Sequence, residues 1–245
     1  MARAGAIVGG LFEALRPKVV PGVDTLALDR FCEEYIVSHE GAVPAFKGLY
    51  GFPGSACISV NEEVVHGIPS ASRVLGDGDI VSVDVGVRLD GWYTDSARTF
   101  PVGEISPEAA TLLDATMGAL EAAVDAAVRG NHVGDIGAAV MASLDGRSYG
   151  IIRDLVGHGI GRELHEEPQV PNVGRAGHGA LLREGMVLAI EPMISLGSAS
   201  IKTLDDGWTV VTADLALSAH FEHTVAITAE GPRILTGAGD AANVA

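Results

Sequence analysis

The chain has 245 residues, of which 47% are hydrophobic, and a formal net charge of −16 from 16 Lys and Arg against 32 Asp and Glu. That length and apolar content suffice for one large domain or two small ones with a full core. The sequence contains neither a basic tract typical of DNA binding nor an apolar run of about eighteen residues typical of a membrane span. Its two cysteines are too few for a disulfide framework, so we expect reduced thiols in a cytoplasmic protein.

The first predicted element is an amphipathic helix over residues 1–18, which we interpret as part of the folded protein rather than as a signal peptide. A break at Pro21 separates it from a second helix, LALDRFCEEYIVSHE, which Asp24 or Thr25 can cap. Residues 42–54, AVPAFKGLYGFPG, combine Gly, Pro and aromatic side chains. This composition fits either a loop that lines a pocket or an ordinary surface loop.

The stretch Ile80–Phe100 carries the strongest hairpin signal. Asp90-Gly91 separates two β-prone runs, and both positions of such a turn need positive φ. In a two-residue hairpin, Asp84 and Asp95 point to the same face as diagonal neighbours, with Cβ atoms roughly 7–8 Å apart. Two metal ions roughly 3.5–4 Å apart can bridge such a gap; alternatively, both are solvated strand residues. The opposite, apolar face would consist of Val81, Val83, Val85 and Val87.

Two further helices are predicted after the hairpin. Ser106-Pro107-Glu108 supplies an N-cap, a proline at the first position and an acid in the first turn of a helix that runs to Gly130. A second helix covers about 134–144, and strands and Gly-rich loops follow. The order of two helices and then a hairpin repeats loosely, and no linker divides the chain. We therefore expect one domain over residues 1–245.

Later segments place more carboxylates and imidazoles on strands or Gly-rich turns. Glu191 interrupts an apolar run, and acids are rarely buried unless they are paired or coordinate a metal. A solvated Glu191 is the less favoured alternative. Four carboxylates would balance the charge of two divalent cations, and oxygen ligation with one imidazole suits Mn, Fe, Co or Zn. The candidate ligands are Asp84, Asp95, His158, Glu191 and Glu222.

Other catalytic motifs are absent or weak. His165-Glu166-Glu167 is not an HExxH zinc helix, because Pro168 breaks a helix there. The sequence has no GxSxG elbow, and Cys57 has no neighbouring histidine, which leaves a thiol nucleophile as a weak possibility.

Five motifs, one of them the Asp84/Asp95 pair of the hairpin, resemble type I methionine aminopeptidases of the pita-bread fold. They are VNEEVVHGIP, the hairpin, GHGIGRELHEEPQVPN, EGMVLAIEPM and DGWTVVTADLALSAHFEHTVAIT. The resemblance extends from Ala4 to about Thr236. It implies an α+β pita-bread fold, in which a pseudo-two-fold antiparallel β-sheet core carries helices on its outer face.

The resemblance also implies a role for each candidate residue. The five candidate ligands would hold two divalent ions, with Asp95 and Glu222 bridging both, and Glu191 would also relay a proton. His66 would contact the substrate amide, the alternative being a capped turn histidine, and His165 would stabilise the tetrahedral intermediate. The methionine side-chain pocket (S1) would be lined by Phe52, Cys57, Leu164, Met193 and Trp208. Leu164 and Phe46 depart from residues common in the family and would alter the shape of this pocket.

The implied activity is metal-dependent removal of the initiator methionine from nascent proteins whose second residue is small. A proline-specific aminopeptidase or dipeptidase of the same fold is one alternative, and a non-catalytic pita-bread peptide-binding protein is another. We expect nascent N-termini as partners, weak ribosome affinity, no DNA or membrane partner, and a cytoplasmic monomer. Members of the family usually carry additional residues before Met1, so the N-terminal extension is expected to be short or missing.

Overall fold

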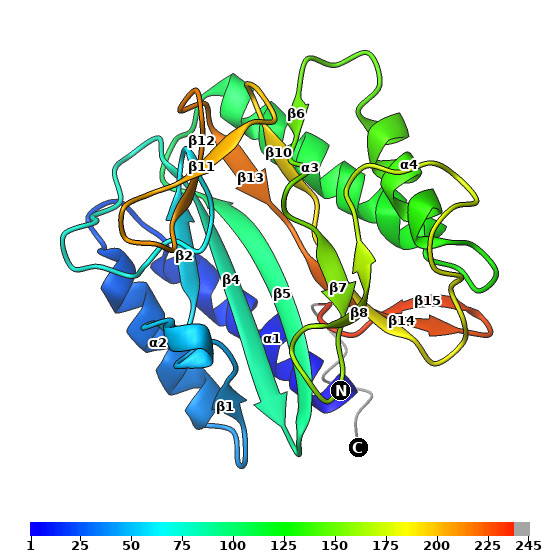
Figure 1. The fold of residues 1–245 in the computed structure, drawn as a ribbon. Helices are drawn as coiled ribbons and strands as arrows, with labels where there is room; N and C mark the ends of the chain where they lie inside the picture. Colours follow the sequence, from blue (N-terminus) through cyan, green and yellow to red (C-terminus); the bar gives the residue numbers. More distant parts are fainter. Residues whose placement is uncertain (238–245) are drawn as a thin grey trace.

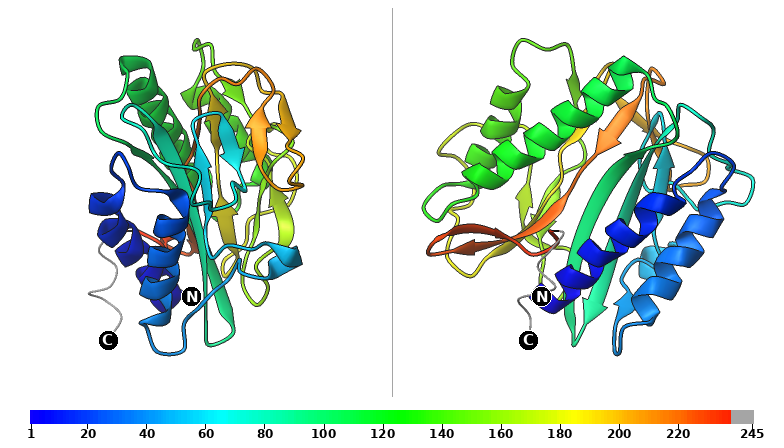
Figure 2. Two further views of the ribbon diagram at one scale, coloured as in Figure 1. Left: turned by 90° about the vertical axis from the view of Figure 1, so that its left-hand side faces the viewer. Right: turned by 180° about the vertical axis from the view of Figure 1, so that it is seen from behind.

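The structure is a computed structural model that describes residues 1–237. Its strands form a central layer, and the helices cover one face of it, as the view from behind shows (Figures 1 and 2). None of the helices within the described residues is both long and apolar enough to cross a membrane. The helices are α1 (Ala2–Leu15), α2 (Thr25–Val37), α3 (Pro107–Ala126) and α4 (Val133–Ser143).

Local signals set most helix ends. Asp24 caps α2 by accepting a hydrogen bond from the Ala27 amide, and Ser106 caps α3 in the same way. The predicted first helix divides into α1 and a 3-10 turn, Arg16–Lys18. Pro17 explains the division, because it lacks the amide that an α-helix needs at that point.

The predicted hairpin is confirmed. Strands β4 (Ile80–Leu89) and β5 (Trp92–Pro101) pair with Gly86 opposite Asp95, and the turn residues Asp90 and Gly91 have φ of 52° and 75°. The apolar face of β4 is fully buried against α1 and α2. The opposite face, which carries Asp84 and Asp95, is therefore turned away from the helices.

The segment that follows α2 contains more regular structure than its composition suggests. Strand β1 (Val43–Pro44) and strand β2 (Cys57–Val60) both pair with β4 in antiparallel orientation. A 3-10 turn over Leu49–Gly51 lies between them. The result is a four-stranded sheet of β1, β4, β2 and β5.

Three further sheets complete the layer, and α3 and α4 pack against strands of two of them. The three sheets have the strand orders β13-β10-β6, β11-β12-β3 and β15-β14-β9-β7-β8. The remaining strands are β3 (Glu63–Val65), β6 (Gly150–Ile151), β7 (Gly157–Gly159), β8 (Glu166–Val170), β9 (Val187–Ile190), β10 (Met193–Ser195), β11 (Ile201–Thr203), β12 (Val210–Thr212), β13 (Ser218–His220), β14 (His223–Thr228) and β15 (Gly231–Ile234).

A broken antiparallel pair takes the place of the hairpin in this half. Strand β9 pairs with β14 up to Ile190 opposite His223, and β10 pairs with β13 from Met193 opposite His220. Between the two pairs the ladder is interrupted at Glu191-Pro192, where proline cannot donate a ladder hydrogen bond. The interruption frees two short stretches of chain, and each carries a glutamate.

Candidate metal centre

Asp84 and Asp95 reach the centre from neighbouring strands of the hairpin. Asp95 is 4% exposed, and its backbone amide donates to Thr224 Oγ1 at 2.9 Å. Thr224 Oγ1 in turn donates to the Asp95 carbonyl at 2.7 Å. Strand β5 is thereby joined to β14 of the other half beside the carboxyl group.

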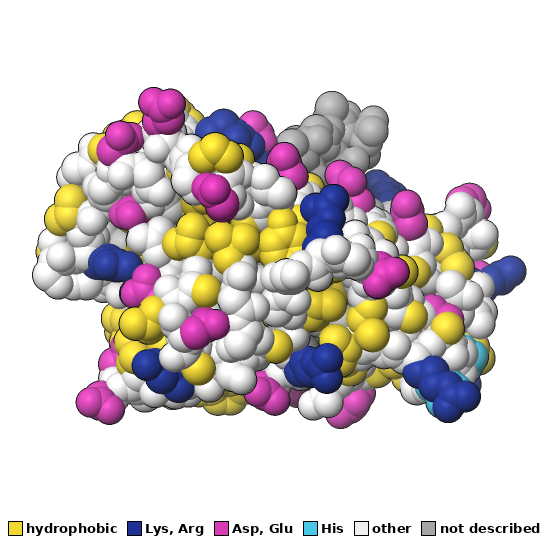
Figure 3. All heavy atoms as spheres, turned by 90° about the horizontal axis from the view of Figure 1, so that it is seen from above, with side chains coloured by type: hydrophobic (Ala, Val, Ile, Leu, Met, Phe, Trp, Pro, Cys, Tyr) yellow, Lys and Arg dark blue, Asp and Glu magenta, His cyan; other side chains and the backbone are white. Residues whose placement is uncertain are grey.

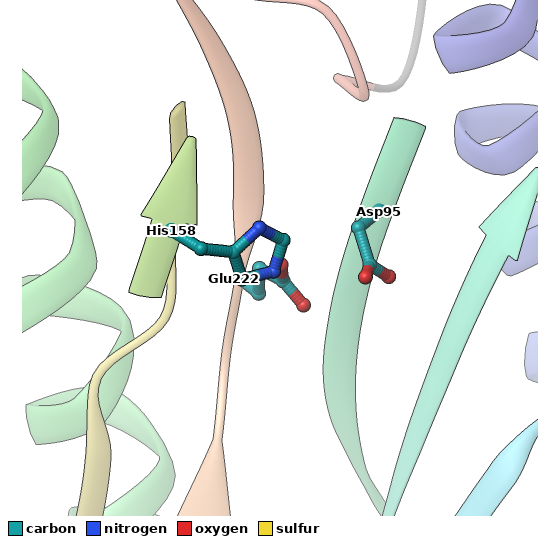
Figure 4. A group of neighbouring side chains, drawn as sticks. All are labelled: Asp95, His158 and Glu222. Atoms are coloured by element: carbon teal, nitrogen blue, oxygen red, sulfur yellow. The ribbon is translucent and has the colours of Figure 1, made fainter. Parts of the chain in front are cut away.

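Glu222 and His158 approach Asp95 from the second half. The carboxylate of Glu222, the imidazole of His158 and the carboxylate of Asp95 each offer a ligand atom within 4.8 Å of the other two (Figure 4). The backbone around Glu222 is fixed, because its amide donates to the Ala97 carbonyl at 2.9 Å and its carbonyl accepts from Ser96 Oγ at 2.6 Å. The cluster thus combines residues from three separate strands or turns.

Glu191 lies between two imidazoles. Its Oε1 is 3.8 Å from His158 Nε2, and its Oε2 is 3.6 Å from His220 Nε2. All five residues predicted as ligands line the same cavity. Asp84 and Glu191 lie beside the cluster of Asp95, His158 and Glu222. His220 was not among the residues singled out from the sequence, although it lies two positions before Glu222.

The electrostatics of this cluster suit bound cations. Burial raises the pKa of Asp84, Glu191 and Glu222 well above the usual range, and neighbouring carboxylates raise each further. Burial raises the pKa of Asp95 to about 7. Asp84 Oδ1, Asp95 Oδ1 and Glu222 Oε1 are buried without a hydrogen-bond partner among the described residues. Unpaired buried carboxylate oxygens beside a neutral imidazole form a donor set that fits divalent metal ions.

The histidines of the site are kept neutral by burial. Burial lowers the pKa of His158 to about 4 and also lowers the pKa values of His66 and His165. His158 Nδ1 lies 2.8 Å from the Gly159 carbonyl, which places a proton on Nδ1 and leaves Nε2 free to bind a metal. Neutral His66 and His165 can each donate one hydrogen bond to a substrate.

A cavity of about 230 Å³ opens beside the carboxylates. Phe52 and Trp208 form one wall in an edge-to-face contact, with ring centroids 5.1 Å apart. Tyr50 also lines it, is 78% exposed and stacks on His165 with ring centroids 6.2 Å apart. Its other apolar lining residues are Phe46, Leu49, Cys57 and Leu164.

Met193 occupies a different place from the other residues predicted for the methionine pocket. It is fully buried with Val65 and Ile152, and it lines a neighbouring cavity of about 290 Å³. The reason is its position on β10, beyond the interruption at Glu191. Leu49 and Tyr50 line the main cavity instead, and the aromatic composition of residues 42–54 was the signal for them.

Two aspartates fix the backbone next to residues of the pocket walls by accepting hydrogen bonds from main-chain amides. Asp29 of α2 accepts hydrogen bonds from the amides of Ser55 and Ala56 at 2.7 and 2.9 Å, just before the strand that carries Cys57. Asp206 accepts from the Trp208 amide at 2.8 Å. The aromatic and thiol side chains are therefore attached to fixed backbone.

Comparisons with known proteins agree on one family. The model of metallopeptidase family M24 matches residues 1–229. A methionine aminopeptidase of Clostridium perfringens is 54% identical over 236 residues, covering 96% of this chain and 94% of that protein. The crystal structure of a methionine aminopeptidase from Thermotoga maritima aligns with a TM-score of 0.94 at 43% identity, covering 97% of this chain and 95% of that one.

A prolidase from Pyrococcus furiosus also aligns, with a TM-score of 0.75 at 23% identity, covering 96% of this chain and 62% of that one. That level of identity shows a shared fold alone. Together these structures confirm the predicted α+β pita-bread fold, with the helices on one face of the strands.

Proposed function

The chain belongs to metallopeptidase family M24, and we infer that it is a methionine aminopeptidase, a hydrolase that releases an N-terminal methionine. The observation that carries this inference is the apolar, aromatic-walled cavity directly beside the cluster of carboxylates and His158. The cavity can hold an unbranched thioether side chain, since sulfur makes favourable contacts with aromatic rings such as Phe52 and Trp208.

We propose that two divalent ions, of Co, Mn, Fe or Zn, occupy the centre. Asp84, Asp95, His158, Glu191 and Glu222 would hold them. The four carboxylates supply four negative charges, which two divalent ions balance. When bound, such ions lower the pKa of a water molecule and polarise the substrate carbonyl.

The remaining steps fall to side chains of this chain. Glu191, whose carboxylate lies between two imidazoles, would accept a proton from the attacking water and pass it to the departing amine. His66 would orient the amide of the scissile bond, and His165 would donate a hydrogen bond to the oxyanion of the tetrahedral intermediate. Both histidines line the cavity, and burial keeps them neutral.

We propose that the substrates are nascent proteins whose second residue is small. Tyr50 supports this restriction, because an exposed ring that also lines the cavity lies at its opening and stacks on His165. A bulky second residue would meet these two rings.

We further propose that the protein is a cytoplasmic monomer that meets ribosomes only weakly. Cys32 and Cys57 are free thiols, as expected in a reducing compartment. On the face drawn in Figure 3, Lys and Arg side chains lie scattered among Asp and Glu. A net charge of −16 opposes approach to a polyanion. Sedimentation with ribosomes at two salt concentrations would test this, and tight binding that collapses at high salt would contradict it.

One experiment separates this function from the proline-specific alternative. The metal-free protein is reconstituted with Co²⁺ or Mn²⁺ and incubated with Met-Ala-Ser, Met-Leu-Ser and an Ala-Pro peptide. We expect metal-dependent release of methionine from Met-Ala-Ser, and much less from Met-Leu-Ser. Cleavage of only the Ala-Pro peptide would overturn the proposal, and cleavage of none would favour a non-catalytic peptide-binding protein.

A further inference from the structure

The imidazole of His220 lies beside Glu191 and has no role in the function proposed above. The residue is 1% exposed, and its Nε2 has no hydrogen-bond partner among the described residues. The facing atom is Glu191 Oε2 at 3.6 Å, slightly beyond hydrogen-bonding range. A buried polar atom without a partner is rare in folded proteins and is often explained by a function of the site it faces.

The two oxygens of Glu191 face different histidines. Oε1 is 3.8 Å from Nε2 of His158, which is a proposed metal ligand, and Oε2 is 3.6 Å from Nε2 of His220. His220 therefore lies on the side of the carboxylate away from His158. A donor at that position would fix the rotation of the carboxylate and keep Oε1 directed toward the other ligands.

The backbone that carries His220 is fixed on two sides. Its amide donates to Thr99 Oγ1 at 2.9 Å, and its carbonyl accepts from the same hydroxyl at 2.9 Å. On the other side His220 pairs with Met193, two residues after Glu191. Strand β13 therefore holds the ring at a constant place relative to the glutamate.

Resting on the function proposed above, we propose that His220 is a positioning residue. Its Nε2 faces Glu191 Oε2 at 3.6 Å, and a small approach of the two groups on metal binding forms the hydrogen bond that keeps Oε1 directed toward the metal ions. Outer partners of this kind orient the residues that ligate metals, and their loss typically lowers metal affinity or activity roughly 10–100-fold. His220 acts through Glu191 and does not itself touch the substrate.

The test compares two substitutions at this position. His220→Gln keeps an N–H donor, whereas His220→Phe keeps a ring of similar size and removes the donor. Each metal-free variant is titrated with Co²⁺ by calorimetry and by visible absorption, and kcat and KM are measured on Met-Ala-Ser. For His220→Phe we expect weaker cobalt affinity, altered visible bands and a kcat lower by roughly 10–100-fold with KM little changed. His220→Gln should restore most of both properties.

Val225→Ala is the matched control. Val225 is fully buried on β14 in the core under α3 and α4, so its truncation should lower the melting temperature without changing the cobalt spectrum or kcat. If His220→Phe equals the wild type in both readouts, the proposal is overturned. It is also overturned if both His220 variants lose one equivalent of cobalt, because His220 would then be a ligand. Absence of cleavage by the wild-type protein would count against the proposed function, whereas the cobalt titration would still test His220.

Discussion

The two halves of the protein supply carboxylates to the same centre by different means. In the first half, Asp84 and Asp95 lie on a continuous hairpin of two ten-residue strands, and the alternation of side chains along each strand directs them. In the second half, Glu191 and Glu222 lie where the ladder between β9–β10 and β13–β14 is interrupted. One pair is directed by regular structure and the other by a local departure from it.

This difference separates what holds each pair in place. The hairpin aspartates depend on a turn and on a buried valine face against α1 and α2. Glu222 depends on hydrogen bonds to the first half, such as that from its amide to the Ala97 carbonyl at 2.9 Å. Substitutions that affect one support and leave the other intact can therefore test the comparison.

The largest effect is expected from removing one charge in either half. Asp84→Asn and Glu222→Gln should each lower metal occupancy and abolish turnover, because each removes one of the four charges proposed to balance two divalent ions. Metal content by mass spectrometry and methionine release from Met-Ala-Ser measure the two consequences. Wild-type activity with full metal content in either variant would contradict a dinuclear centre to which both halves contribute carboxylate ligands.

A smaller loss is expected from a residue that serves the reaction without holding metal. His165→Ala should lower kcat by roughly 10²–10³, because it removes the hydrogen-bond donor that we propose for the oxyanion. Metal content should stay at the wild-type level. Loss of a metal ion in this variant would show that His165 is a ligand.

The pH dependence of stability should reveal the buried carboxylates directly. Burial raises the pKa of Asp95 to about 7 and that of Glu222 well above its usual range. A carboxyl group with a raised folded-state pKa holds a proton that the unfolded chain has already released, so its stability contribution is lost as pH rises through the folded pKa. Buried histidines act in the opposite sense, because burial lowers their folded-state pKa values, but above about pH 7.5 histidines are nearly neutral in both states and add little.

The metal-free protein should therefore melt at a lower temperature at about pH 8.5 than at about pH 7.5. Each group that titrates contributes up to about 1.4 kcal/mol per pH unit, and a protein of this size loses about 2–4 °C per kcal/mol. Circular dichroism in the presence of a chelator measures the effect, and Asp95→Asn should reduce the slope. A melting temperature that rises over this interval would contradict the assignment.

The smallest effect is expected at the turn between β4 and β5. Asp90 has φ of 52°, so Asp90→Ala should destabilise the protein by about 1 kcal/mol and lower its melting temperature by about 2–4 °C. Asp90→Gly is the control, since glycine accepts positive φ and also removes the exposed ion pair with Arg3. Metal content and kcat should not change in either variant. Equal melting temperatures for Asp90→Ala and Asp90→Gly would show that the turn is not strained.

The sequence predicted those features that depend on neighbours along the chain. The hairpin, its register and the caps Asp24 and Ser106 follow from short patterns, and the structure has all of them. Strand β1 was expected as loop, because its two residues pair only at the edge of β4 and show no alternation.

The features that depend on distant segments were harder to predict. The interruption at Glu191-Pro192 and the approach of His220 to Glu191 both depend on pairing between β9–β10 and β13–β14. In the sequence, β11 and β12 lie between these two pairs of strands. The resemblance assigns Met193 to the methionine pocket, but in the structure its side chain packs with Val65, on the strand beyond the interruption. Pro192 marks the interruption locally, but no local pattern in the sequence shows which distant side chains meet there.

The hydrogen bonds between Asp95 and Thr224, and between Ser96 and Glu222, join the two halves at the centre itself. Partial opening between the halves would have to break these bonds and separate the carboxylates at the same time. The amide protons of Asp95 and Glu222 should therefore exchange with deuterated solvent only when the whole molecule unfolds, as in the most protected segments of cooperative proteins. Heat inactivation of the enzyme should then coincide with its global unfolding rather than precede it.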